Sequence, residues 1–343
     1  MRLALACPDK FRGTLTAPEA AEAMATGLTR AGFDEVRRLP LADGGEGTLD
    51  ALFSARGGGL RTAPVTGPLG ETVEAAWGVL PDGTAVVEMA RASGLELVSG
   101  RNDPLRAGTR GTGELIAATA RAGARRIVVG VGGSATTDGG LAAVQALGWS
   151  LGGIDVTVAC DVATPFLAAA EVYAPQKGAT AAQVSLLTRR LRRLAEEYER
   201  RTGVDVTGLE GAGAAGGLAG GLAALGAKLE PGFDVVAQAA GLEDALENVD
   251  LVVTGEGKLD RTSFDGKVVG GVLEWAAEEG IARQTVIAGQ ATDDGREELS
   301  IRGDVQLLTL TERVWQAGEA FSRAAVLVEE AALEAGRGAL ANP

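Results

Sequence analysis

Eight short apolar runs recur along this chain, and they constrain its fold more than any other feature of the sequence. The runs cover residues 2–7, 36–42, 84–90, 126–131, 155–160, 250–254, 284–289 and 305–310. Several are followed at once by glycine with acidic or hydroxyl residues, and then by a helical pattern. This order is typical of α/β proteins, whose ligands collect at the carboxyl ends of strands. We therefore expect buried strands that alternate with helices.

Residues 60–90 follow a different pattern, in which short strand-like runs alternate with Gly-Pro and Pro-Asp-Gly turns. This pattern predicts antiparallel strands. A length of 343 residues is long for one core and favours about two domains. We interpret the antiparallel segment as the beginning of a second, inserted domain.

Two later segments allow more than one reading. A helix is predicted over residues 180–203, with Thr180 and Gln183 as a capping box. Its arginine cluster alternates at four-residue spacing with Glu196 and Glu197, which favours a solvated, ion-paired face over a nucleic-acid surface. The glycine-rich residues 211–227 fit a tightly packed helix and a phosphate loop followed by a helix equally well.

Composition excludes several classes of function. A net charge of −14 argues against a nucleic-acid or anionic-membrane partner, because either needs a basic face. The chain has no histidine, so Ser-His-Asp and Cys-His nucleophiles and an imidazole base are excluded. Cys7 and Cys160 each end an apolar run and are expected to be buried core thiols. No signal peptide or membrane span is apparent, so we expect a cytoplasmic protein.

Five glycine-rich or charged loops concentrate the remaining chemistry. They are PDKFRGT at 8–14, ADGGEG at 42–47, GGSATTDGG at 132–140, APQKGAT at 174–180 and TGEGKLDRTSFDGK at 254–267. The cations within them are Lys10, Arg12, Lys177, Lys258 and Lys267. Carboxylates are plentiful as well: Asp9, Asp43, Glu46, Asp138, Asp161, Glu256, Asp260 and Asp265. Phosphoryl transfer needs backbone N–H groups, lysine or arginine, and carboxylate-held Mg²⁺. This set therefore predicts phosphoryl transfer, without the Walker sequence of a P-loop NTPase.

Other readings of these loops stay open. Gly130, Gly132 and Ala135 satisfy G-x-G-x-x-G/A after a strand, as in a dinucleotide-binding oxidoreductase. The candidate for the acidic residue that would hold the ribose is Asp161, which comes late, 31 positions after Gly130. Asp43 and Asp138 also suit helix N-caps, for helices beginning near residues 46 and 141.

Taken in order, the motifs of the chain resemble those of the bacterial class I glycerate kinases. The matching segments are residues 6–13, 41–48, 130–140, 159–162, 174–179 and 254–260, followed by Gly266-Lys267. The resemblance implies ATP- and Mg²⁺-dependent phosphorylation of D-glycerate, usually to 2-phosphoglycerate, with 3-phosphoglycerate as the other product. It also implies a Rossmann-like α/β domain and an inserted α/β domain, with the active site in the cleft between them.

On this basis we expect a discontinuous Rossmann-like domain at residues 1–62 and 245–343, and an inserted domain with an antiparallel portion at 63–244. Side-chain chemistry suggests the individual roles. Lys10, Arg12, Ser134 and Thr136 are expected to bind substrate, and Gly132, Gly133, Lys177 and Lys267 to bind phosphate or nucleotide. The candidate bases are Asp43, Asp138 and Asp260, and the candidate metal ligands are Asp161 and Glu256, with Asp260 suited to either role.

The sequence also departs from the family pattern. Arg12 replaces a lysine, Thr137 an asparagine, Ala174 a glycine, and Asp265 a position often occupied by histidine. Only WSLGGI separates Gly148 from the strand at 155–160, where the family usually carries a few tens of residues more. A divergent paralogue that binds a phosphorylated metabolite without turnover is therefore a second hypothesis, and an NAD-dependent oxidoreductase a third. Both monomer and homodimer are compatible with the sequence.

Overall fold

The computed structural model of the protein describes residues 1–315 and 317–341. The chain forms two compact units. Unit 1 comprises Met1–Asp43, Asp50–Arg56 and Val236–Pro343, and unit 2 comprises Gly44–Leu49 and Gly57–Val235. We expected the chain to pass into the inserted domain after residue 62 and to leave it after residue 244. In the structure these two boundaries follow residues 56 and 235. The short excursion of Gly44–Leu49 into unit 2 has no counterpart in the sequence pattern.

Unit 1 is built on a five-stranded parallel sheet with the order β11-β10-β9-β1-β2. Its strands are β1 (Leu3–Ala6), β2 (Glu35–Arg38), β9 (Leu251–Leu259), β10 (Gln284–Ala291) and β11 (Val305–Thr309). Its helices include α1 (Ala17–Ala31), α10 (Leu242–Leu246), α11 (Val268–Glu278), α12 (Asp293–Ser300), α13 (Ala317–Ser322) and α14 (Ala324–Ala341). The helices α2 (Thr48–Arg56) and α9 (Gly232–Ala240) each span a unit boundary.

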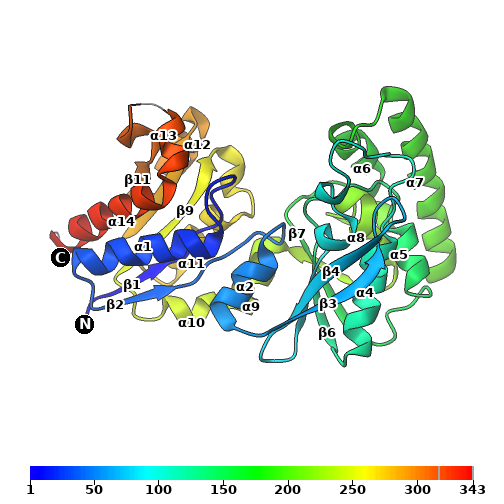
Figure 1. Cartoon of the computed structure of the whole chain (residues 1–343), viewed down its shortest axis with the longest axis horizontal. Helices are drawn as coiled ribbons and strands as arrows, with labels where there is room; N and C mark the ends of the chain where they lie inside the picture. Colours follow the sequence, from blue (N-terminus) through cyan, green and yellow to red (C-terminus); the bar gives the residue numbers. More distant parts are fainter. Residues whose placement is uncertain (316, 342–343) are drawn as a thin grey trace. The chain divides into compact units, whose positions relative to one another are not determined.

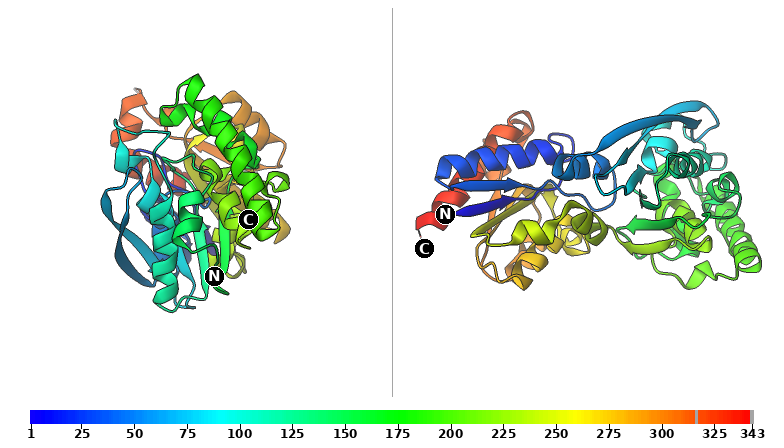
Figure 2. Two further views of the ribbon diagram at one scale, coloured as in Figure 1. Left: turned by 90° about the vertical axis from the view of Figure 1, so that its right-hand side faces the viewer. Right: turned by 90° about the horizontal axis from the view of Figure 1, so that it is seen from below.

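Helices α1 and α14 lie side by side over this sheet (Figure 1), as the perpendicular view of Figure 2 also shows. Their backbones approach so closely that a Cβ on Gly27 would stand 2.2 Å from the carbonyl oxygen of Glu329. The sequence provides this close packing through small residues, and Thr16 and Glu19 fix the start of α1 as a capping box. Unit 1 therefore has its own core.

Unit 2 contains a six-stranded mixed sheet with the order β3-β4-β5-β6-β7-β8. Its strands are β3 (Gly59–Thr66), β4 (Thr72–Val79), β5 (Ala85–Glu88), β6 (Arg126–Gly130), β7 (Asp155–Cys160) and β8 (Lys228–Pro231). Its helices are α3 (Ala90–Ser93), α4 (Arg110–Arg121), α5 (Leu141–Ala146), α6 (Ala169–Tyr173), α7 (Ala181–Thr202) and α8 (Ala214–Ala224). The pairs β3–β4 and β4–β5 are antiparallel, and the pairs from β5 to β8 are parallel.

These sheets confirm the strand predictions. Each of the eight apolar runs forms a strand, and residues 60–90 form the antiparallel portion of unit 2. The predicted α/β class, with a parallel sheet and a second mixed sheet, is therefore correct. The sequence pattern missed β8, because its residues 228–231 are mostly polar and largely exposed.

The helix predicted over residues 180–203 is α7, and Thr180 and Gln183 form its capping box. Arg200 and Arg201 both pair with Glu197, so the ion-paired face is present in the last turns of the helix. Residues 211–227 take the form of a loop followed by a helix. Ala215, with the next two glycines, has a left-handed backbone inside α8, and the rest of α8 is helical.

Cys7 and Cys160 are both buried free thiols, as the sequence predicted. Burial raises the pKa of each thiol, so neither is reactive at neutral pH. Among the helices of residues 1–315 and 317–341, we find none with the length and apolar character needed to cross a membrane.

Candidate functional site

In unit 1, polar side chains gather where β1 and β9 end. Beyond the end of β1, the amide of Cys7 donates to the carbonyl of Val253 in β9, and the amide of Asp9 donates to that of Gly255, both at 2.9 Å. These bonds hold Asp9 beside Glu256, which β9 itself carries. Asp43 reaches the same group, because its charge acts on Asp9. The carboxyl edge of the parallel sheet thus collects three carboxylates, as the α/β pattern predicts.

The pKa values of Asp9 and Glu256 are both raised above those of ordinary carboxylates. Burial raises the pKa of Asp9 to about 7, and the negative charge of Asp43 adds to this effect. Burial likewise raises the pKa of Glu256 to about 7, although a hydrogen bond from Ser263 opposes it. Oε1 of Glu256 is buried without a hydrogen-bond partner. Such perturbed groups are common at functional sites.

Two lysines lie near these carboxylates. The charges of Lys10 and Lys267 both lower the pKa of Asp9, and that of Lys267 also lowers the pKa of Glu256. Nζ of Lys267 donates to the hydroxyl of Thr262 at 3.3 Å. Both lysines were predicted site residues, and unit 1 brings them to the same cluster.

Asp260 has a structural task next to this cluster. Its carboxylate caps the short 3₁₀ helix Arg261–Phe264 and accepts from the amide and hydroxyl of Thr262, at 3.0 and 2.7 Å. It also pairs with Lys258 at 3.0 Å. These hydrogen bonds lower the pKa of Asp260. Arg12 is exposed and lines a separate, small pocket of about 50 Å³ with Phe11 and Gln290.

In unit 2, the loop that follows β6 surrounds a buried lysine. Lys177 is only 3% exposed, and its Nζ donates to Oγ of Ser134 at 2.7 Å and to the carbonyl oxygen of Thr136 at 2.6 Å. Burial lowers the pKa of Lys177 to about 7, and the charge of Asp138 opposes this shift. The side chain of Asn102 joins the two segments, because it donates to the carbonyls of Ala135 and Lys177.

Asp138 serves as a double cap. Its carboxylate accepts from the amides of Gly140 and Ala142 at the start of α5, at 3.2 and 3.3 Å. The amide and the hydroxyl of Thr109, just before α4, donate to it at 2.9 Å. Burial nevertheless raises the pKa of Asp138, outweighing these bonds. Asp138 therefore accepts from an amide in the first turn of α5, as the capping interpretation expects, but Gly140 holds the N-cap position. Its link to Thr109 has no signal in the sequence.

The glycines after β6 have a packing role. A Cβ on Gly130 would stand 2.5 Å from the carbonyl oxygen of Gly44, and one on Gly132 would stand 2.7 Å from Cα of Gly45. Gly133 has a left-handed backbone with φ of +70°. The loops at 42–47 and 132–140 therefore pack backbone to backbone. Helix α5 begins only at Leu141, whereas a dinucleotide fingerprint opens a helix within the glycine motif itself.

Two further residues at this site were missed by sequence reasoning. Glu88, at the end of β5, is 3% exposed, and its Oε1 accepts from the amides of Gly47 and Leu49 at 3.0 and 2.9 Å. It thereby fixes the 42–47 loop at the start of α2. In the sequence Asp9 is one carboxylate among many, and its position shortly after a buried strand is the available signal. Asp161 follows β7; burial raises the pKa of Tyr173, and the negative charge of Asp161 adds to this effect.

The carboxylates of the described residues do not by themselves form a complete metal site. Within the described residues, no group of three or more Asp, Glu, Cys or His side chains could hold a metal ion. Asp161 lies in unit 2 and Glu256 in unit 1. Mg²⁺ is commonly bound by only one or two carboxylates together with substrate phosphates. Oε1 of Glu256, which has no hydrogen-bond partner and has Asp9 nearby, fits a site in which one or two carboxylates and substrate phosphates bind Mg²⁺.

Comparison with known proteins gives a consistent family. The model of the glycerate kinase family, a family of phosphotransferases, matches residues 4–153 and 150–339. The two matched segments meet where the sequence is shorter than the family pattern. The chain is 42% identical to Glycerate 2-kinase of Escherichia coli K12 over 332 residues, which is 86% of each chain. It is 37% identical to Glycerate kinase of Halalkalibacterium halodurans over 97% of each chain.

A solved structure agrees with these sequence matches. The crystal structure of a candidate glycerate kinase 2 from Salmonella typhimurium LT2 has a TM-score of 0.84 and 35% sequence identity. The similarity covers 99% of this chain and 98% of that one. With the motifs in order and the family model spanning nearly the whole sequence, the chain belongs to the glycerate kinase family.

Proposed function

We propose that this protein transfers the γ-phosphoryl group of ATP to D-glycerate in the presence of Mg²⁺ and forms 2-phosphoglycerate. The observation that carries the proposal is the buried ammonium of Lys177. Its hydrogen-bond partners in the described part of the chain are two neutral oxygens, from Ser134 and Thr136. A buried cation without a direct ion pair is costly, and an incoming phosphate supplies the missing negative charge.

The unit 2 loop then acts as a phosphate cradle. Gly132 and Gly133 have no side chains to block an approach to their amides, and Lys177 supplies charge next to Ser134. Backbone amides and a lysine are the usual means of stabilising a transferring phosphoryl group. Thr136 contributes through its carbonyl oxygen, which orients Lys177, since its hydroxyl is buried.

The unit 1 cluster provides the acid-base and metal-binding groups of the proposal. A general base works best when its pKa lies near the working pH, and Asp9 and Glu256 both meet this condition. We assign the base role to Asp9, supported by Asp43, because Asp260 has a lowered pKa and caps a helix. Arg12 and Lys10 supply the positive charge that a glycerate carboxylate requires.

Glu256 is the residue of unit 1 that would hold Mg²⁺, which leaves Asp9 free as the base, and Asp161 stays a predicted ligand from unit 2. When bound to the nucleotide, Mg²⁺ neutralises charge on the phosphate oxygens. Oxygen ligands suit this hard cation, and the unpartnered Oε1 of Glu256 is such a ligand.

The test is an ADP-release assay with a panel of small hydroxy acids, with and without Mg²⁺. We expect ADP release that requires both D-glycerate and Mg²⁺. Phosphorus NMR of the product then identifies the phosphorylated hydroxyl, and a signal for 2-phosphoglycerate is expected. The absence of ADP release with every acid, from protein that still binds ATP, contradicts the proposal and favours a non-catalytic paralogue.

A further inference from the structure

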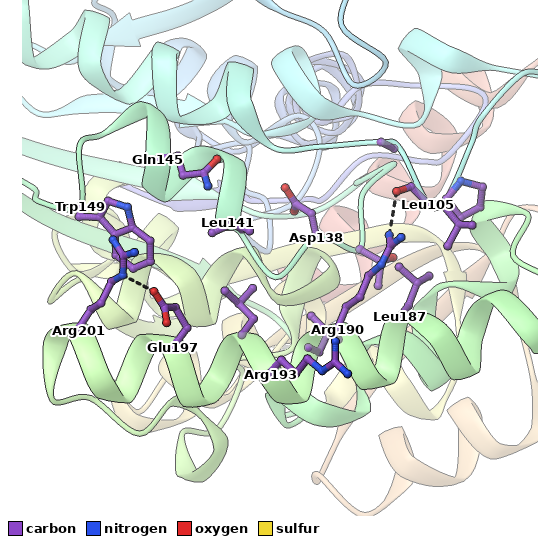
Figure 3. Close-up of a pocket in the computed structure, with 15 residues that line it drawn as sticks. Leu105, Asp138, Leu141, Gln145, Trp149, Leu187, Arg190, Arg193, Glu197 and Arg201 are labelled. Carbon is purple, nitrogen blue, oxygen red and sulfur yellow. Dashed lines mark hydrogen bonds and ion pairs between the residues drawn. The ribbon is translucent and has the colours of Figure 1, made fainter.

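A pocket of about 510 Å³ opens in unit 2 between α5, α7 and the chain that precedes α4. Figure 3 shows α7 along one side of it, with Leu141 and Gln145 of α5 on the other. Its inner surface is apolar and includes Leu141, Leu187, Leu191 and Leu194. Pockets that bind small organic molecules typically measure about 300–1,000 Å³ and have mostly apolar walls.

The rim of this pocket carries three arginines from α7. Arg190 donates to the carbonyl of Leu105 at 3.1 Å. The guanidinium of Arg201 pairs with Glu197 and lies 4.2 Å from the centre of the Trp149 ring. Arg193 also lines the pocket, and across residues 1–315 and 317–341 the structure gives its guanidinium no hydrogen bond or ion pair.

This arrangement differs from the ion-paired surface that the sequence suggested. Arg193 stands four residues before Glu197, yet Glu197 pairs with Arg200 and Arg201 instead. Arginines are therefore concentrated at one apolar pocket of a chain whose net charge is −14. A guanidinium at the edge of an apolar pocket suits a carboxylate, sulfonate or phosphate, since it donates two parallel hydrogen bonds.

Trp149 supplies a second and independent observation. Its backbone has φ of +61°, a left-handed conformation that is rare for a bulky residue and costs of order 1–3 kcal/mol. The indole packs edge-on against Tyr198, with ring centres 5.9 Å apart, and is covered by Arg201. The strained backbone thus holds a rigid aromatic surface in the pocket wall, where it can contact an apolar ligand.

Asp138 forms another part of the wall, where hydrogen bonds within the protein occupy its carboxylate. Its carboxylate oxygens accept four hydrogen bonds, from Thr109, Gly140 and Ala142. Three of the donors are backbone amides and the fourth is the hydroxyl of Thr109. Because Asp138 ends the loop that also carries Ser134, an occupant of the pocket would contact the far end of that loop.

From these observations we propose that the pocket is a binding site for an organic anion with an apolar body of the size of one or two rings. The leucines and Trp149 receive the apolar body, and Arg193 pairs with the anionic group. The proposal is independent of the reaction proposed above, because it rests on the pocket and its charges alone.

The test compares two dyes of nearly the same shape. The dye 1-anilinonaphthalene-8-sulfonate carries an anionic group, and N-phenyl-1-naphthylamine is its uncharged analogue. Fluorescence titration of the full-length protein gives a dissociation constant for each dye. We expect the anionic dye to bind about tenfold more tightly than the neutral one, as a charge-assisted hydrogen bond implies.

Three variants assign the binding to this pocket. Arg193→Gln is expected to weaken binding of the anionic dye about tenfold and to leave the neutral dye unchanged. Arg192→Gln is the matched control, because it removes the same charge from the next residue of α7, which does not line the pocket. Gln145→Trp fills the pocket from its exposed side and is expected to weaken both dyes at least tenfold. Urea unfolding of each variant confirms that it is folded.

Three results would overturn the proposal. They are equal affinities of the two dyes for the wild-type protein, equal effects of Arg193→Gln and Arg192→Gln, and unchanged binding of both dyes to Gln145→Trp.

Discussion

Replacing Glu256 by glutamine is expected to stabilise the protein at alkaline pH. The folded state raises the pKa of Glu256 from 4.5 to about 7 by burial. Between these values the folded state binds more protons than the unfolded state, so stability falls as pH rises through this window. Each unit corresponds to about 1.4 kcal/mol, and the full penalty above pH 7 is therefore about 3 kcal/mol. Glutamine has the same shape and carries no charge to desolvate.

The assay is urea unfolding of the wild type and of Glu256→Gln at about pH 8 and about pH 5. We expect the variant to be more stable by about 3 kcal/mol at the higher pH and by less than about 1 kcal/mol at the lower one. Glu274→Gln, an exposed change on α11, is the matched control and should stay within about 0.5 kcal/mol of the wild type at both. A variant no more stable than the wild type at pH 8 would refute the reasoning that the desolvated carboxylate of Glu256 destabilises this site.

Three further predictions concern unit 2. Lys177→Met removes the buried cation, and we expect ADP release to fall at least about 100-fold while the unfolding free energy does not decrease; wild-type turnover would contradict its role. Asp138→Asn replaces one of the two carboxylate oxygens that together accept four hydrogen bonds. We expect the free energy of unfolding, measured with urea, to fall by about 1–3 kcal/mol. An unchanged free energy of unfolding would argue against the double cap. Gly216→Ala would put a Cβ 2.0 Å from the carbonyl oxygen of Thr136, so we expect a lower thermal midpoint or little soluble protein; Gly226→Ala, also left-handed but with nothing within 4 Å, is the control and should cost about 1 kcal/mol. Equal losses in the two glycine variants would show that the contact with Thr136 is unimportant.

Much of the fold was predictable because it depends on local patterns. Buried parallel strands appear as continuous apolar runs. The capping box of Thr180 and Gln183 marks where α7 begins. The strand β8 was not predicted because its sequence, KLEP, contains no apolar run. Its place at the edge of the sheet follows from pairing with β7. Pairing partners distant in sequence leave no local signal.

The candidate site was predictable at the level of loops rather than of single residues. The five loops do carry the charged groups, yet the task of each carboxylate depends on its neighbours in space. Asp260 and Asp138 proved to accept hydrogen bonds from nearby amides, whereas burial removes Asp9 and Glu256 from water and raises their pKa. Desolvation is a property of the folded surroundings, so the sequence gives no direct measure of it.

The division of the chain has a consequence for how the protein folds during synthesis. Strand β1 pairs with β9, and the amide of Leu3 donates to Asp250, which is 247 residues further along. Unit 2 consists mainly of the continuous segment Gly57–Val235, so all its strands leave the ribosome before β9 does. At about 5–20 residues per second, one edge of β1 waits roughly 12–50 s for its partner. Since an open strand edge is a template for pairing with other chains, this edge of β1 is exposed to such pairing until β9 has been made.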